Sequence, residues 1–254
     1  MEKGVGAIPL LEEASENAPS GLRARIRLIV DELATMQVSR QFEELVRTSG
    51  EDIDLEAGIL LIARYGYPNQ DLRWCTKTLD QLSHELDSKL DVRYDPGEII
   101  SAIATFFGQD KGFSGNTEDY YDADNSYINR VLQRRSGLPI SLCSLYLLVA
   151  RRLNIPLFGV GMPGHFLLKY QVGENEIFLD PFRGGKLLSR TDCREFLEVI
   201  GLGFRDEYLQ TVSNRQIIER MIRNLIVAYR HRGEMYRLPS LQGLLSLLGS
   251  DQHG

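Results

Sequence analysis

One nearly continuous apolar segment near the middle of the chain constrains the fold more than any other feature. The segment GLPISLCSLYLLVARRLNIP contains Pro139, which suits the first turn of a helix, and it ends at Asn154 and Pro156. Its apolar side chains leave almost no polar face, so it predicts a buried helix over residues 139–153. Its uninterrupted apolar part is far shorter than the roughly 20 residues that a membrane span needs. The segment therefore predicts a central core helix.

The segments on either side of this helix predict an α+β fold. Upstream, apolar residues recur every three or four positions between Leu22 and Phe107, which predicts about five helices. Downstream, the pattern predicts three short strands and then three helices. The strands cover residues 157–161, 165–172 and 176–180, and the helices cover residues 190–200, 214–232 and 240–248. One buried helix beside antiparallel strands is an α+β arrangement.

These elements divide the chain into four regions. Residues 1–20 are polar, turn-rich and without periodicity, so we expect them to be disordered. Residues 21–111 form a helical region, residues 112–200 a core and residues 201–254 a helical tail. The core opens with a loop, residues 112–126, that imitates the start of a calcium loop. The required glycine and distal glutamate are missing, so we predict no metal site there.

Composition excludes several classes of function. The chain has 35 acidic and 29 basic residues and a net charge of −6, which argues against general attraction to nucleic acid or to an anionic membrane. The arginines of the tail lack interleaved aromatic residues and are typical of a solvated helix face. Three cysteines form a sparse and odd set, which predicts reduced thiols and a cytoplasmic protein. No signal peptide, zinc spacing or nucleotide-binding glycine loop is present, so no cofactor is predicted.

His165 and Asp180 are the residues best placed to carry chemistry. His165 starts one predicted strand and Asp180 ends the next. A two-residue turn that pairs Val172 with Asn175 would put both side chains on one face of the hairpin, whereas an odd loop would separate them. A carboxylate can orient an imidazole, and a nucleophile at the start of the buried helix would complete a catalytic triad. The alternative is a structural histidine with a hydrogen-bonded partner.

A series of motifs in a fixed order makes the chain similar to a known family. NSYINRVL, GLPISL, PGHF and LDPF follow one another, and together they resemble the bacterial SirB-type transglutaminase-like proteins, a branch of the papain and transglutaminase fold. The similarity extends over residues 54–235. It implies a helical N-terminal region, a transglutaminase-like core whose central helix packs on a short antiparallel sheet, and a helical, tetratricopeptide-like tail.

The resemblance also implies that the catalytic nucleophile is absent. In catalytic members the helix begins with Gly-x-Cys, about fifteen residues before a Gly-Ile-Pro ending. Here Asn154 begins the corresponding ending, and Pro139 stands at the cysteine position. His165 matches the catalytic histidine and Asp180 matches the orienting aspartate. Because proline can be neither nucleophile nor proton donor, the match implies a remnant triad.

Two other residues of the same helix are candidate nucleophiles. Cys143 lies one turn further along, where a buried thiol with a raised pKa is the alternative interpretation. Ser141 lies in the first turn, where a local cap or a solvated hydroxyl is the alternative. Asn125 and Asn129, with Pro139, are expected to line the same cleft, and helix caps or surface contacts are the alternative for the two asparagines.

The sequence therefore predicts a non-catalytic transglutaminase-like protein, a cytoplasmic protein-binding or regulatory module with a protein partner. It predicts no metal, cofactor, nucleic acid or membrane partner. One alternative is a cysteine or serine hydrolase or acyltransferase that uses Cys143 or Ser141 with His165 and Asp180. Another is an adaptor that acts through its tetratricopeptide-like tail.

Overall fold

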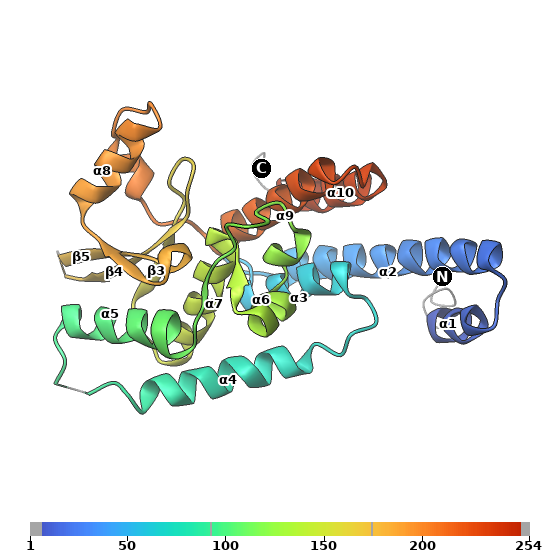
Figure 1. The fold of residues 1–254 in the computed structure, drawn as a ribbon, viewed down its shortest axis with the longest axis horizontal. Coiled ribbons are helices and arrows are strands. Elements are labelled where there is room, and N and C mark those ends of the chain that lie inside the picture. Colours follow the sequence, from blue (N-terminus) through green and yellow to red (C-terminus); the bar gives the residue numbers. More distant parts are fainter. Residues whose placement is uncertain (1–6, 92, 174, 250–254) are drawn as a thin grey trace.

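The computed structural model describes residues 7–91, 93–173 and 175–249, in which a small sheet lies at one side of a largely helical molecule (Figure 1). The helices are α1 (Ile8–Glu16), α2 (Ser20–Thr48), α3 (Leu55–Gly66), α4 (Arg73–Asp87), α5 (Pro96–Thr105), α6 (Ile128–Arg134), α7 (Pro139–Arg152), α8 (Arg190–Val199), α9 (Asn214–His231) and α10 (Leu238–Gly249). The strands are β1 (Ser114–Gly115), β2 (Ser136–Gly137), β3 (Leu157–Val160), β4 (Leu167–Val172), β5 (Asn175–Asp180) and β6 (Lys186–Leu188). The mixed α and β class predicted from the sequence is confirmed.

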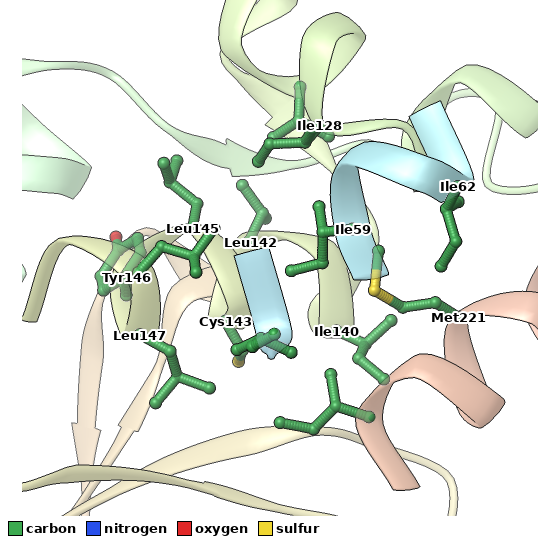
Figure 2. Close-up of a cluster of buried hydrophobic side chains, with 14 of the residues drawn as sticks. Ile59, Ile62, Ile128, Ile140, Leu142, Cys143, Leu145, Tyr146, Leu147 and Met221 are labelled. Carbon is green, nitrogen blue, oxygen red and sulfur yellow. The ribbon is translucent and has the colours of Figure 1, made fainter. Parts of the chain in front are cut away.

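Helix α7 lies in the middle of the molecule and corresponds to the segment predicted over residues 139–153. Pro139 occupies the first helical turn, where its missing N–H leaves no hydrogen bond unmade. Every residue from Pro139 to Ala150 is buried, because α4, α6, α9 and the sheet pack around the helix. Figure 2 shows this core, in which side chains of α7 meet Ile59 and Ile62 of α3 and Met221 of α9.

The main sheet is antiparallel and has the strand order β3-β4-β5-β6. A tight turn joins β4 to β5, and Gly173 adopts a positive φ of 60° there. Val172 pairs with Asn175 and Leu168 pairs with Leu179, which is the register that a two-residue turn predicts. Strand β6 was not predicted, since it has only three residues and follows the Gly184–Gly185 turn.

Three hydrophobic clusters are buried in the described residues. The main cluster extends from α2 to α10, through α3, α4, α6, α7 and α9. A second cluster lies between the sheet and α8 and includes Phe178 and Leu197. A third joins α1 to the first half of α2 through Ile8, Ile26 and Val30. The arrangement places α9, part of the predicted tail, in the same core as α7.

The N-terminal region differs from its prediction as a disordered segment over residues 1–20. Residues 8–16 form α1, and α2 begins at Ser20, whereas residues 1–6 lie outside the described part of the chain. Ile8 and Ala18 pack on Ile26 and Val30 of α2, so a tertiary contact stabilises a segment whose own periodicity is weak. Within the described residues, no helix is long and apolar enough to cross a membrane.

Candidate functional site

His165 and Asp180 meet at one end of the β4–β5 hairpin, as the register of a two-residue turn predicts. His165 lies two residues before β4 and Asp180 is the last residue of β5, so the ladder brings them to one end of the hairpin. His165 Nε2 is 2.8 Å from Asp180 Oδ2. Asp180 is fully buried and His165 is 9% exposed. The side chains therefore form a hydrogen-bonded pair shielded from bulk water.

The Asp180 carboxylate is fixed by the backbone of the turn that follows it. Its Oδ1 accepts hydrogen bonds from the N–H groups of Phe182, at 3.1 Å, and Arg183, at 3.3 Å. Its Oδ2 accepts from His165 Nε2. A carboxylate can only accept a hydrogen bond, so Nε2 is the donor in this pair. Among the described residues, Nδ1 makes no hydrogen bond, so it is the nitrogen available to a ligand.

Arg220 of α9 holds the backbone of His165 from the other side. Its Nη2 donates to His165 O at 2.8 Å, and its guanidinium lies 5.3 Å from the centre of the Phe166 ring. Burial lowers the pKa of Arg220, and no carboxylate in the described residues forms an ion pair with it. Sequence reasoning missed this contact, because Arg220 is 55 residues away and backbone carbonyls leave no signature in a sequence. Arg220 is therefore a positioning residue for the histidine.

A pocket of about 260 Å³ opens beside the pair. His165 and Asp180 form part of its wall, and Lys186 of β6 and Phe196 and Val199 of α8 form another part. The His165 ring lies 5.6 Å from the ring of Phe196, measured between centres. A ligand in this pocket would contact the imidazole, an aromatic face and charged side chains.

The two candidate nucleophiles lie outside the pocket lining. Cys143 is fully buried in the core around α7 (Figure 2), and its Sγ is 3.5 Å from O of Phe166, the residue directly before β4. Burial, reinforced by the charge of Asp180, raises the pKa of the Cys143 thiol well above its ordinary value. Ser141 is also buried, and its Oγ donates to Asn125 O at 2.6 Å. Both groups therefore serve the packing of α7.

Asn125 and Asn129 do not line the pocket, which corrects the expectation from the sequence. Asn125 Nδ2 donates to Asp119 O at 2.7 Å, and its Oδ1 accepts from Asn116, so it braces the loop before α6. Asn129 Nδ2 donates to Gln70 Oε1. Both asparagines are fully buried, so surface contact is also excluded. Pro139 is buried as well and lies outside the lining.

The acidic loop that imitates a calcium site is held by arginines. Asp122 pairs with Arg134 at 2.7 Å, and Asp124 pairs with Arg130 at 2.9 Å. Burial alone would raise the pKa of Asp122, but the hydrogen bond from Arg134 and the N–H of Asp124 outweigh it and hold that pKa below its ordinary value. No three His, Cys, Asp or Glu side chains are grouped to hold a metal ion anywhere in the described chain.

Comparison with known proteins gives the class of protein to which this buried helix and its neighbouring His–Asp hairpin belong. The family model of the transglutaminase-like superfamily matches residues 73–223. A UPF0162 protein of Xylella fastidiosa (strain 9a5c) is 35% identical over 194 residues, which cover 74% of this chain and 69% of that protein. A UPF0162 protein of Vibrio cholerae is 34% identical over 197 residues, which cover 74% of this chain and 72% of that protein. The chain therefore belongs to the transglutaminase-like superfamily and to the UPF0162 family.

The similarity extends to part of a much larger protein. F-box only protein 21 of Mus musculus is 36% identical over 144 residues, which cover 54% of this chain but 22% of that protein. No solved structure gives a significant match.

Proposed function

We propose that this protein is a non-catalytic, SirB-type member of its superfamily, in which Pro139 occupies the nucleophile position and the retained cleft binds a protein partner. The observation that carries the proposal is that neither possible nucleophile is free to attack a substrate. The Cys143 thiol is buried with a raised pKa, and the Ser141 hydroxyl donates to a backbone carbonyl. A histidine and an aspartate alone can orient a ligand, but they supply no attacking group for acyl transfer.

Exposed apolar residues at the mouth of the pocket support a protein as the ligand. Val199 lines the pocket and is 85% exposed, and Ile200 and Leu202, one and three residues further along the chain, are 43% and 39% exposed. An apolar rim next to a pocket that contains charged side chains suits a peptide segment that covers the rim and places a polar group against His165. The 144-residue match within F-box only protein 21 also suits a module that serves as one part of a larger chain.

The absence of a nucleophile is tested by thiol labelling of the native protein with iodoacetamide. Burial raises the pKa of Cys193 to about 11 and that of Cys75 to about 12, and it raises the pKa of Cys143 well above its ordinary value. At pH 8, fewer than about one thiol in a thousand would then be ionised. We expect no adduct on the folded wild type by intact mass and three after denaturation. One fast adduct on Cys143 would instead support the hydrolase alternative.

The variant Pro139→Cys tests whether the proline stands at the nucleophile position. A thiol there would lie in the first turn of α7, where the helix dipole favours the thiolate. We expect Pro139→Cys to gain one rapid adduct, and Pro139→Cys/His165→Ala to react at least about tenfold more slowly. Equal rates in the two variants would contradict the assignment of Pro139 to this position.

Partner binding is tested with two matched valine substitutions. Val199→Glu places a charge on the pocket rim, whereas Val227→Glu places one on α9, where Val227 is 47% exposed and outside the pocket lining. We expect a partner captured and identified with the wild type to bind Val227→Glu normally. Val199→Glu should bind it at least about tenfold more weakly in a titration with purified components. Equal affinity for both variants would exclude this rim as the binding surface.

The adaptor alternative receives less support from the packing of the tail. Ile218, Ile222 and Leu225 of α9 are fully buried in the main core, and Arg220 holds His165. This helix therefore supports the central fold, and its apolar face is not free for a partner.

A further inference from the structure

A stripe of exposed apolar residues runs along the N-terminal part of α2. This 29-residue helix extends away from α7 and the sheet, and α1 packs along its first half (Figure 1). Leu22, Ile29 and Met36 are 52%, 46% and 49% exposed. Residues seven apart are nearly two helical turns apart and lie on one face, which is the repeat of helices that pack against each other. The stripe therefore has the pattern of a helix–helix contact whose partner helix lies outside the monomer.

Two charged residues of opposite sign accompany this stripe. Arg25 and Glu32 are also seven residues apart, so they lie on the same flank of the stripe. Both are exposed, and neither forms an ion pair with any residue whose side chain the structure describes. By contrast, Glu44 and Arg47 at the other end of α2 pair with each other at 2.6 Å. The charges beside the stripe are therefore available to a partner.

A groove runs beside the second half of the stripe. It has a volume of about 380 Å³ and lies between α2 and the start of α10. Met36 and Leu28 form one wall, and Tyr65, Tyr236 and Pro239 form the other. Leu28 is 62% exposed and Tyr236 is 64% exposed. Glu32 and Arg237 also line this groove, and its apolar residues give a large side chain of the partner a place to pack.

We propose that this face of α2 binds the same face of a second copy of the chain, with the two helices antiparallel and the two-fold axis near Ile29. In this arrangement Ile29 meets Ile29 of the second copy, and Leu22 faces Met36 and the groove of the second copy. Arg25 then lies beside Glu32 of the second copy, and the two-fold axis produces this pair twice. A parallel arrangement places like charges at the same level and forms neither pair. The alternation of sign along one flank therefore selects an antiparallel homodimer.

This inference does not depend on the proposed function, because the pocket of His165 is formed by other elements. The apolar stripe and Leu28 together expose on the order of a few hundred Å², the size at which a surface patch is often an interaction site. Association would bury these side chains and neutralise both charges. The charge pattern makes the face complementary to itself, which is the requirement for a two-fold dimer.

Sedimentation equilibrium of the full chain over a range of concentrations tests the dimer. We expect the wild type to dimerise and Ile29→Glu to be monomeric, because the substitution places two like charges on the two-fold axis. Val227→Glu is the matched control, with an exposed aliphatic residue on α9, and it should dimerise as the wild type does. Far-UV circular dichroism checks that all variants keep their helices. A wild type that is monomeric at every concentration would overturn the proposal.

Charge exchange tests the antiparallel arrangement. Arg25→Glu and Glu32→Arg each turn two attractive pairs into two repulsive ones, so each should weaken dimerisation by about tenfold. The double variant Arg25→Glu/Glu32→Arg restores both pairs with reversed sign and should return the dissociation constant to near the wild-type value. A double variant as weak as the single variants would overturn the arrangement, as would single variants that dimerise normally.

Discussion

Asp180 satisfies three hydrogen-bond donors with one buried carboxylate. His165 Nε2 donates to one oxygen, and the N–H groups of Phe182 and Arg183 donate to the other. Charge-assisted hydrogen bonds of this kind are stronger than neutral ones, and donors left without an acceptor in the interior cost free energy. The residue therefore fixes the local fold as well as the imidazole.

Replacement of this carboxylate should be far more costly than loss of the imidazole. Asp180→Ala leaves all three donors without an acceptor and should lower the free energy of unfolding by about 3 kcal/mol. His165→Ala leaves the carboxylate with its two backbone donors and should cost about 1 kcal/mol. Urea unfolding followed by circular dichroism measures both values. If the two variants lose the same stability, the carboxylate has no structural role beyond the pair.

At the residue scale, the sequence predicts contacts between residues whose positions are set by regular secondary structure. The hairpin register determines which residues meet, so His165 and Asp180 were found from their positions in two strands. The hydrogen bonds of Arg220 and Asn125 were not predicted, because their partners are backbone carbonyls that tertiary folding brings near. The rim residue Val199 was also missed, since an exposed valine at the end of a helix has no distinctive pattern.

Elements approach most closely where glycine replaces a side chain. One π-helical turn, Phe106–Asp110, follows α5 and packs against the Gly184–Gly185 turn between β5 and β6. A Cβ atom on Gly108 would lie 2.1 Å from Gly184 O. That oxygen belongs to the backbone, so the turn itself would have to move. The contact joins the helical region to the loop after Asp180.

Gly108→Ala should therefore destabilise the protein by about 3 kcal/mol or more, although alanine usually stabilises helical backbone by up to about 1 kcal/mol. Gly243→Ala is the matched control, because a Cβ atom there meets nothing within 4 Å and Gly243 lies inside α10. This control should be neutral or slightly stabilising. Midpoints of thermal unfolding distinguish the two variants. Equal midpoints would show that the Gly184–Gly185 turn can move without loss of stability.

At the element scale, a helix or strand can be predicted when its hydrophobic pattern extends over enough residues. A long apolar run bounded by prolines made α7 predictable, and two alternating segments around Gly173 made the β4–β5 hairpin predictable. Strand β6 is too short to carry a pattern and depends on pairing with β5. Helix α1 depends on α2 for the apolar surface it covers. Elements that rely on a neighbour for their stability were the ones missed.

The whole molecule is organised around one core that crosses the predicted boundaries between regions. Helices from the helical region, the transglutaminase-like core and the tail all contribute to the main cluster, in which Ile59, Tyr146 and Ile222 are fully buried. The sequence marks where elements change, but it does not show which elements share a core. The cluster between α1 and α2 is separate from this core and is built from fewer side chains.

This separation predicts two kinds of unfolding. Ile222→Ala removes buried methyl groups from the shared core and should lower the global free energy of unfolding by about 3 kcal/mol. Ile26→Ala affects the smaller cluster, where the residue is 7% exposed, and should cost about 1 kcal/mol, mainly through local opening of α1. Hydrogen exchange measures this difference: Ile222→Ala should speed exchange in α3, α7 and α9 together, and Ile26→Ala only in α1 and the first half of α2. Faster exchange of α7 in Ile26→Ala would show that the two clusters unfold as one unit.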